Sequence, residues 1–411
     1  MEKQNNSQIA KNATYLTVAS ILQKIISFGY YIYIARILGD INLGKYAFAL
    51  SFSSIFVIFM DFGLSPVLTR EGAKENKDIQ KYLSYILALK IILITGSIIA
   101  MIIIINVMGN LENFSAYDIN LVYLAGIIIV LDTLTFSFYS VYRAWQKMKY
   151  EAIGVLIYQI IIACVGVYLL SRGSEAMGAL VAIMAGSIFN FSYSLYLVFV
   201  KGKLKFKLTF DRKKFFTLLK IAAPFALAGI FFKLNGSVDT VMLKSLSGDR
   251  FVGWYNVAFK MTMALTVLPG AFATSFFPAM SYYFKHDTSK LKSVFEKSMV
   301  YLFILSLPIG IGTILIANDL IITIYTDAFE ASVIALQIFM AGLFFIFINY
   351  PIGNFLNAVN RQTINTMNMG IALLINIVLN MILIPKYTYI GAAFSAVISS
   401  VVLVFLGFPW V

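Results

Sequence analysis

The chain contains one cysteine, Cys164, and one histidine, His286, among 411 residues. A single cysteine cannot form an intramolecular disulfide, and neither residue has the companions that a zinc or iron–sulfur site requires. We therefore expect no metal and no cofactor. Cys164 is predicted to pack inside a helix, and His286 to lie in a solvated loop beside Lys285 and Asp287.

Charge is also scarce, because only 12% of the residues are charged whereas 60% are hydrophobic. A membrane-spanning helix needs about 20 predominantly apolar residues. Twelve segments meet this requirement, and the first of them is too long for the core of a signal peptide. They lie near residues 13–35, 43–62, 82–107, 119–142, 150–170, 177–200, 214–243, 251–275, 297–318, 331–351, 363–384 and 390–408. We predict an all-α integral membrane protein with about 12 transmembrane helices and no room for an extramembrane catalytic domain.

The net charge of +13 would suggest a nucleic-acid partner if the protein were soluble. In a membrane protein, however, Lys and Arg gather in the cytoplasmic loops. With the N-terminus inside, the count of Lys and Arg is 22 on the cytoplasmic side and six on the opposite side, namely Arg36, Lys45, Arg172, Lys244, Arg250 and Lys386. We predict a multi-pass protein of the cell (inner or cytoplasmic) membrane with a cytoplasmic N-terminus and no nucleic-acid partner.

The sequence repeats itself at an offset of 209 positions, which aligns residues 39–46 with residues 248–255. The shared pattern is G-D-x-x-apolar-G-x-Y-x-x-A, and the same offset places Lys24 on Lys233. Chance is a poor explanation, because the identities include glycines, aspartates and lysines rather than only Ile and Leu.

The repeat predicts an N-terminal six-helix lobe over residues 1–200, a basic cytoplasmic linker over 201–213 and a C-terminal six-helix lobe over 214–411. Six is an even number of spans, so both lobes have the same orientation in the membrane. Parallel repeats of this kind occur in alternating-access transporters that bind substrate between the lobes.

Seven ionisable residues inside the predicted spans are candidates for a functional role. An intramembrane charge costs at least about 2.5–3.5 kcal/mol, so such residues usually face the protein interior or a water-filled path. Those near span ends have a second explanation, because Asp61, Lys90 and Lys260 could snorkel to the interface. The seven are Lys24, Asp61, Lys90, Asp132, Lys233, Asp239 and Lys260.

Helical spacing places Lys24 on one face with Thr17, Ser20, Ser27 and Tyr31. The repeat copy, Gly229, Lys233, Gly236 and Thr240, has the same character, and so does the series Asp132, Thr135, Tyr139 and Tyr142. These faces suit the walls of a central cavity, but small polar residues also make contacts between helices. Seven asparagines leave the same two alternatives open, a sugar site or bonds between helices. They are Asn349, Asn354, Asn357, Asn365, Asn368, Asn376 and Asn380.

Residues 39–45 nearly spell a phosphate-binding loop. Tyr46 occupies the Ser/Thr position, however, and the preceding element is a membrane helix, so ATP binding is not expected. No signature of a hydrolase or metalloprotease appears either, and we expect a protein that is not an enzyme.

The segments A-R-I-L-G-D-I-N-L-G-K-Y-A (35–47), D-F-G-L-S-P (61–66) and L-N-G-S-V-D-T-V-M-L (234–243) resemble polysaccharide biosynthesis flippases of the Wzx type. These flippases belong to the multidrug/oligosaccharidyl-lipid/polysaccharide exporter superfamily. The resemblance implies translocation of an isoprenoid pyrophosphate-linked oligosaccharide from the inner to the outer leaflet by alternating access. It also implies lipid-linked oligosaccharide and membrane lipid as partners, together with the glycosyltransferases and glycan polymerase of the same pathway.

Cationic lumen residues of such flippases are thought to meet the pyrophosphate, a role that would fall here to Lys24, Lys233 and Arg36. The other candidate substrate-binding residues are Asp61, Asp132, Asp239 and Lys260. Two relatives of the same superfamily remain alternatives: a multidrug extruder exchanging organic cations for protons or sodium, and a lipid II flippase. A membrane glycosyl-transfer enzyme would need an acidic or histidine cluster that the sequence does not show.

Overall fold

The computed structural model describes residues 2–74, 78–205 and 211–411, and within these ranges helices are the only regular secondary structure. The elements from the N-terminus to the linker are α1 (Glu2–Asp61), α2 (Leu64–Lys74), α3 (Ile79–Glu112), α4 (Ala116–Ala144), α5 (Lys149–Ser171), α6 (Ala176–Leu195) and the π-helix η2 (Tyr196–Lys201). They are followed by α7 (Arg212–Asn235), α8 (Val238–Ser247), α9 (Asp249–Leu265), α10 (Val267–His286), α11 (Thr288–Ile324), η3 (Asp327–Phe329), α12 (Ser332–Ala341), α13 (Leu343–Ala358), α14 (Gln362–Gly407) and η4 (Phe408–Trp410).

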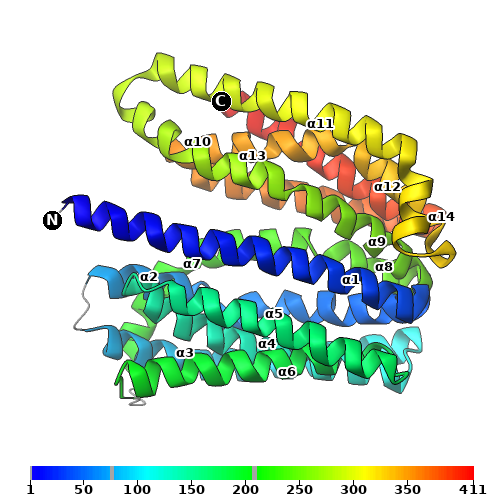
Figure 1. Ribbon diagram of the computed structural model, residues 1–411, viewed down its shortest axis with the longest axis horizontal. Helices are drawn as coiled ribbons and strands as arrows, with labels where there is room; N and C mark the ends of the chain where they lie inside the picture. The colour runs from blue at the N-terminus through cyan, green and yellow to red at the C-terminus, as the bar shows by residue number, and fades with distance from the viewer. Residues whose placement is uncertain (1, 75–77, 206–210) are drawn as a thin grey trace. The chain divides into compact units, whose positions relative to one another are not determined.

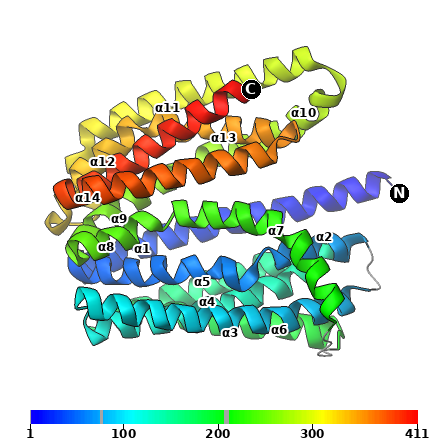
Figure 2. The ribbon, with the colours of Figure 1, turned by 180° about the vertical axis from the view of Figure 1, so that it is seen from behind.

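Two of these helices are too long for a single crossing. A straight helix of 60 residues, the length of α1, would measure about 90 Å, whereas the apolar core of a bilayer is about 30 Å thick. The chain turns back at Gly39 in α1, as Figure 1 shows, and at Thr388 in the 46-residue α14, as Figure 2 shows. Both residues have non-helical backbone angles, so each of these helices consists of two spans.

By length and composition, nine described helices could cross a membrane, or ten if α12 and α13, which meet at a 47° bend, form one span. Counting the two halves of α1 and of α14 separately gives the twelve predicted spans, and the predicted fold class is confirmed. The predicted span 214–243 is wrong as a continuous helix, because α7 ends at Asn235 and α8 begins at Val238. The turn between them contains Gly236 and Ser237, which are poor helix formers.

The contacts within the chain define two compact units. Unit 1 comprises Met1–Ile37 and Ala49–Lys233, and unit 2 comprises Leu38–Phe48 and Leu234–Val411. This division reflects packing, whereas the predicted lobes reflect repeat symmetry, so the boundary at residues 201–213 stays a prediction.

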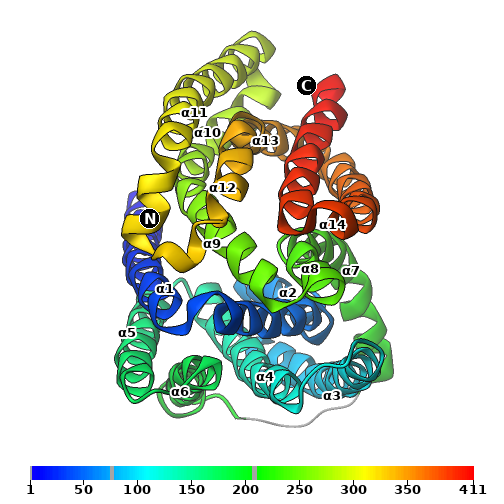
Figure 3. The ribbon, with the colours of Figure 1, turned by 90° about the vertical axis from the view of Figure 1, so that its right-hand side faces the viewer.

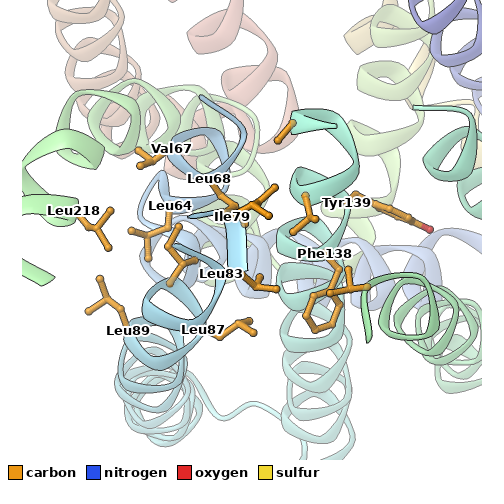
Figure 4. Packing of buried hydrophobic residues seen from close by; sticks show 14 of the residues in the cluster. Leu64, Val67, Leu68, Ile79, Leu83, Leu87, Leu89, Phe138, Tyr139 and Leu218 are labelled. Carbon is orange, nitrogen blue, oxygen red and sulfur yellow. The ribbon is translucent and has the colours of Figure 1, made fainter. Parts of the chain in front are cut away.

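Unit 1 has its main apolar core where α2, α3, α4 and α7 meet. Figure 4 shows Leu64, Leu83, Phe138 and Leu218 from these four helices around a common centre. The opposite side of α3 is different, because Ile91, Ile99 and Ile103 are about half exposed. Figure 3 views α3, α4 and α6 nearly end-on. Exposed isoleucines on a 34-residue helix are typical of a lipid-facing surface, since lipid tails solvate them as well as a protein core does.

In unit 2, the first glycine of each motif copy has a backbone conformation that other residues rarely adopt. Gly39 (φ 66°) and Gly248 (φ 100°), the first glycine of each copy, combine positive φ with extended ψ, a conformation essentially restricted to glycine. At each of them the chain changes direction between two helical segments.

The second glycines of the motif bring the two copies into backbone contact. A Cβ on Gly44 would lie 1.9 Å from the carbonyl oxygen of Asp249, and a Cβ on Gly253 would lie 2.1 Å from that of Asp40. Arg250 reinforces the contact with an ion pair to Asp40, with its Nε 3.2 Å from Oδ2. The two copies therefore pack against each other reciprocally, and no side chain larger than hydrogen fits at either glycine.

Candidate functional site

A pocket of about 350 Å³ in unit 1 contains two of the predicted site residues, Asp61 and Asp132. We call it the Asp61–Asp132 pocket. Gly63 (φ 72°) allows the close approach of α7, because a Cβ there would lie 2.9 Å from the carbonyl oxygen of Ala222. The lining residues come from α1, α2, α4, α7 and the turn after α1: Val57, Ile58, Asp61, Gly63, Pro66, Asp132, Thr133, Phe136, Phe225, Ala226 and Gly229.

Asp61 forms a buried ion pair with Lys90. The Lys90 side chain is fully buried, and its Nζ lies 2.5 Å from Asp61 Oδ1. The same ammonium donates to Ser65 Oγ (3.2 Å) and to the Thr133 carbonyl oxygen (2.9 Å), while Ser65 donates to Asp61. The alternative that Asp61 and Lys90 snorkel to the interface is therefore wrong. The pair is a fixed internal link between α1, α2, α3 and α4, and it neutralises the Asp61 carboxylate.

Asp132 has no such partner. Its Oδ1 accepts a hydrogen bond from Ser187 Oγ of α6 at 2.7 Å, and no cation pairs with it in the described parts of the chain. It therefore provides the net negative charge of the Asp61–Asp132 pocket, beside the rings of Phe136 and Phe225.

Asp239 belongs to a separate, fully buried network in unit 2. Its carboxylate accepts hydrogen bonds from Tyr255 Oη (2.9 Å) and from Asn380 Nδ2 (2.6 Å). Asn380 Nδ2 also donates to Asn376 Oδ1 (3.1 Å). The network joins α8, α9 and α14.

Other asparagines of the 349–380 region also bridge segments. Asn349 donates to the Ser400 carbonyl oxygen, Asn365 to Asn357, and Asn368 to the Leu406 carbonyl oxygen. These contacts favour the helix-to-helix explanation of the asparagines over a sugar site.

The two repeat lysines differ from the buried ionisable groups. Lys24 is exposed and Lys233 is half-buried. In the described part of the molecule, neither forms a hydrogen bond or an ion pair. Arg36 and Lys260 are exposed as well, but each has an interaction partner. Joint binding of one ligand by Lys24 and Lys233 stays a prediction.

Sequence reasoning missed three uncharged members of these networks, Ser65, Ser187 and Tyr255. It named Lys90 but did not identify it as the partner of Asp61. The available signal was the four-residue spacing of Asp61–Ser65 and of Asn376–Asn380, which places each pair on one helical face.

Two further predictions concern single residues. Cys164 lies in α5, as the span 150–170 predicted, and its side chain is exposed. His286 ends α10 and stacks on Tyr282, with ring centroids 4.3 Å apart.

Residues 9–284 match the family model described as "Polysaccharide biosynthesis protein". The chain belongs to this family. A second model, MatE, matches residues 224–382. The family resemblance inferred from the sequence is confirmed.

The relatives include proteins named for polysaccharide and glycan biosynthesis. The "Capsular polysaccharide biosynthesis protein CapF" of Staphylococcus aureus is 24% identical over 96% of this chain and 97% of its own length. The "Probable low-salt glycan biosynthesis flippase Agl15" of Haloferax volcanii is 23% identical over 95% of this chain and 81% of its own. None of these family relatives is named as an enzyme.

Solved structures share the fold. The lipid II flippase MurJ in an inward closed conformation superposes with a TM-score of 0.78 at 20% identity, covering 96% of this chain and 87% of MurJ. An inward-facing multidrug resistance MATE family transporter has a TM-score of 0.76 at 16% identity and covers 97% of both chains. These neighbours support the predicted two-lobe, twelve-helix fold.

Proposed function

We propose that the protein is a flippase that moves an isoprenoid pyrophosphate-linked oligosaccharide from the inner to the outer leaflet for surface polysaccharide biosynthesis. The observation that carries the proposal is the pair of repeat lysines, Lys24 and Lys233, which lie in apolar helices without a counter-ion in the described residues. An unneutralised intramembrane cation is costly, so it points to an anionic ligand that is bound in the working state.

The chemistry of the substrate explains why a protein path is needed. Each sugar hydroxyl that enters hydrocarbon without a hydrogen-bond partner costs several kcal/mol, whereas the apolar isoprenoid chain dissolves in the bilayer without such a cost. A polar path lowers the cost for the headgroup, and Lys24 and Lys233 hold the pyrophosphate while the lobes alternate between the two sides. The N-terminus and the basic linker are cytoplasmic in this proposal.

A multidrug cation extruder is the second candidate, and one observation favours it. The Asp61–Asp132 pocket has an acidic group, Asp132, without a cationic partner in the described residues, beside Phe136 and Phe225. A carboxylate next to aromatic rings suits an organic cation. The lipid II alternative differs from the main proposal only in the headgroup carried.

Lipid-linked glycans extracted from cells lacking the protein distinguish these functions. The proposal expects oligosaccharide-pyrophosphate lipid to accumulate and surface glycan to disappear. The wild type restores both, and the Lys24→Ala/Lys233→Ala variant does not. Unchanged pools together with increased sensitivity to cationic drugs would establish the extruder instead, and accumulation of lipid II would establish the lipid II flippase.

Two control variants make the result specific to the lysine charges. Lys24→Arg/Lys233→Arg keeps both charges and is expected to retain most of the rescue. Lys292→Ala removes a lysine that is 77% exposed and lies far along the sequence in α11, and it is expected to rescue fully. If Lys292→Ala also failed to rescue, loss of any lysine charge would impair the protein, and the effect would not be specific to the repeat lysines.

A further inference from the structure

A second pocket of about 480 Å³ lies in unit 1, where α4 ends, α5 begins and α6 continues into η2. Tyr142 belongs to the polar face described above, and Lys201 and Gly202 begin the predicted linker, but the pocket shares no lining residue with the Asp61–Asp132 pocket. We call it the lysine–aromatic pocket, and its lining residues are Tyr142, Trp145, Lys147, Tyr150, Lys201 and Gly202.

The backbone around the pocket is irregular in three places. Gln146 (φ 55°) and Lys203 (φ 53°) both adopt the left-handed conformation, which is unfavourable for residues other than glycine. Residues 196–201 form a π-helix, a rare element that occurs frequently at functional sites. Three departures from the preferred backbone around one cavity indicate that its shape is maintained against a local conformational cost.

Specific contacts maintain that shape. Tyr142 Oη donates to the Leu197 carbonyl oxygen at 2.7 Å, which ties α4 to η2. A Cβ on Gly202 would lie 2.7 Å from the Val198 carbonyl oxygen and 3.1 Å from the Trp145 ring, so only glycine fits there. The walls of the pocket are therefore fixed.

The charge of the pocket is positive and uncompensated. Glu151, the nearest acidic residue in the sequence, is engaged by Arg143, whose Nε donates to Oε2 at 2.8 Å. Lys201 Nζ lies 4.2 Å from the centre of the Tyr150 ring, and Lys147 Nζ lies 5.7 Å from that of Trp145. Neither lysine, nor Lys149 beside them, forms an ion pair in the described portion of the chain.

A neighbouring pocket of about 290 Å³ on the same unit provides a contrast, because acidic residues line it together with its lysines. Lys81 Nζ lies 2.6 Å from Asp78 Oδ1, and Lys214 Nζ donates to Tyr85 Oη at 3.0 Å. Both pockets have two lysines, but the carboxylates of Glu71 and Asp78 line this one, whereas the described lining of the lysine–aromatic pocket has no acidic residue.

We propose that the lysine–aromatic pocket binds a lipid phosphate headgroup at the cytoplasmic membrane surface. Lys147 and Lys201 meet the phosphate charge. Trp145 and Tyr150 have the amphipathic rings that favour the membrane–water interface and pack against the glycerol or isoprenoid portion of the lipid. Basic pockets at the cytoplasmic ends of transmembrane helices bind anionic headgroups in this way. The cytoplasmic placement rests on the orientation in the proposed function, but binding of the headgroup does not require transport.

Native mass spectrometry of the full-length protein in detergent tests the proposal, with phosphatidylglycerol, phosphatidylcholine and a polyprenyl pyrophosphate as probes. We expect the anionic lipids to bind more tightly than phosphatidylcholine. Each lysine near an anionic surface contributes about a fivefold change in affinity, so Lys147→Gln/Lys201→Gln should weaken anionic-lipid binding roughly 25-fold.

Lys81→Gln/Lys214→Gln is the matched control, because it removes the same charge from the neighbouring pocket and should leave the affinity within about twofold. Tyr150→Leu tests the aromatic wall without changing charge and should weaken binding, whereas Tyr150→Phe should not. Equal losses in the two double-lysine variants, or no loss in either, would overturn the proposal.

The probes also identify the source of the headgroup. A lysine-dependent effect on both anionic lipids assigns the pocket to a resident acidic phospholipid. An effect on the polyprenyl pyrophosphate alone assigns it to first capture of the flippase substrate. Because binding is measured at equilibrium without transport, a negative result here leaves the glycan-accumulation experiment unaffected, and the converse also holds.

Discussion

The buried Asp61–Lys90 pair shows why an ionisable residue in a membrane helix need not touch substrate. Lys90 is completely shielded and bonded to three oxygen atoms, so removing its charge would leave the Asp61 carboxylate uncompensated. We predict that Lys90→Met lowers the free energy of unfolding in mixed detergent by about 3–5 kcal/mol. Adding Asp61→Asn to that variant should recover a large part of the loss.

The double variant also separates structure from function. If the pair only links helices, Lys90→Met/Asp61→Asn should fold and still clear lipid-linked glycan in the cell assay. A well-folded double variant without flipping activity would show that the Asp61–Lys90 pair also has a role in transport. The sequence could not distinguish these roles, because Asp61 and Lys90 are 29 positions apart on different helices and pair only through the tertiary fold.

At the scale of elements, the reciprocal contact between the two motif copies in unit 2 leaves no room for a side chain at either second glycine. Gly44→Ala would place a methyl group 1.9 Å from the Asp249 carbonyl oxygen, so the backbone would have to move. We predict a loss of stability of about 1–3 kcal/mol or more for Gly44→Ala and similarly for Gly253→Ala, measured as the free energy of unfolding in mixed detergent.

Gly312→Ala in α11 is the matched control, since a Cβ there would meet nothing within 4 Å and alanine favours the helix. It should be neutral or slightly stabilising. Unfolding free energies of Gly44→Ala and Gly312→Ala that agree within error would mean that the two motif copies do not stay in contact in the membrane.

The helices themselves were largely predictable from the sequence, because bilayer thickness sets a length that apolar runs must meet. The break between α7 and α8 was not, since residues 234–243 remain apolar on average across Gly236 and Ser237. The repeat motif could be recognised in the sequence, but the reason for its second glycine could not. That glycine packs against the aspartate carbonyl oxygen of the other copy, a contact that depends on how the two segments pack.

At the scale of the whole molecule, the arrangement of charge limits the energetics of transport. A pyrophosphate that moves outward down an inside-negative potential gains about 2.3 kcal/mol per charge per 100 mV. Asp132 and Asp239, neither of which has a cationic partner in the described residues, are the groups at which a coupled cation could bind and cancel that gain.

Proteoliposomes with an imposed potassium diffusion potential measure this directly. If the headgroup moves alone, a potential of about 100 mV should enrich the pyrophosphate lipid in the leaflet on the positive side by about 50-fold per charge at equilibrium. The random orientation of the protein in the vesicles does not matter, because the potential acts on the substrate. If the distribution of the lipid between the leaflets did not change with the potential, a compensating cation would have to move together with the lipid. In that case Asp132→Asn and Asp239→Asn identify its site, because the variant that loses the cation should restore the response to the potential.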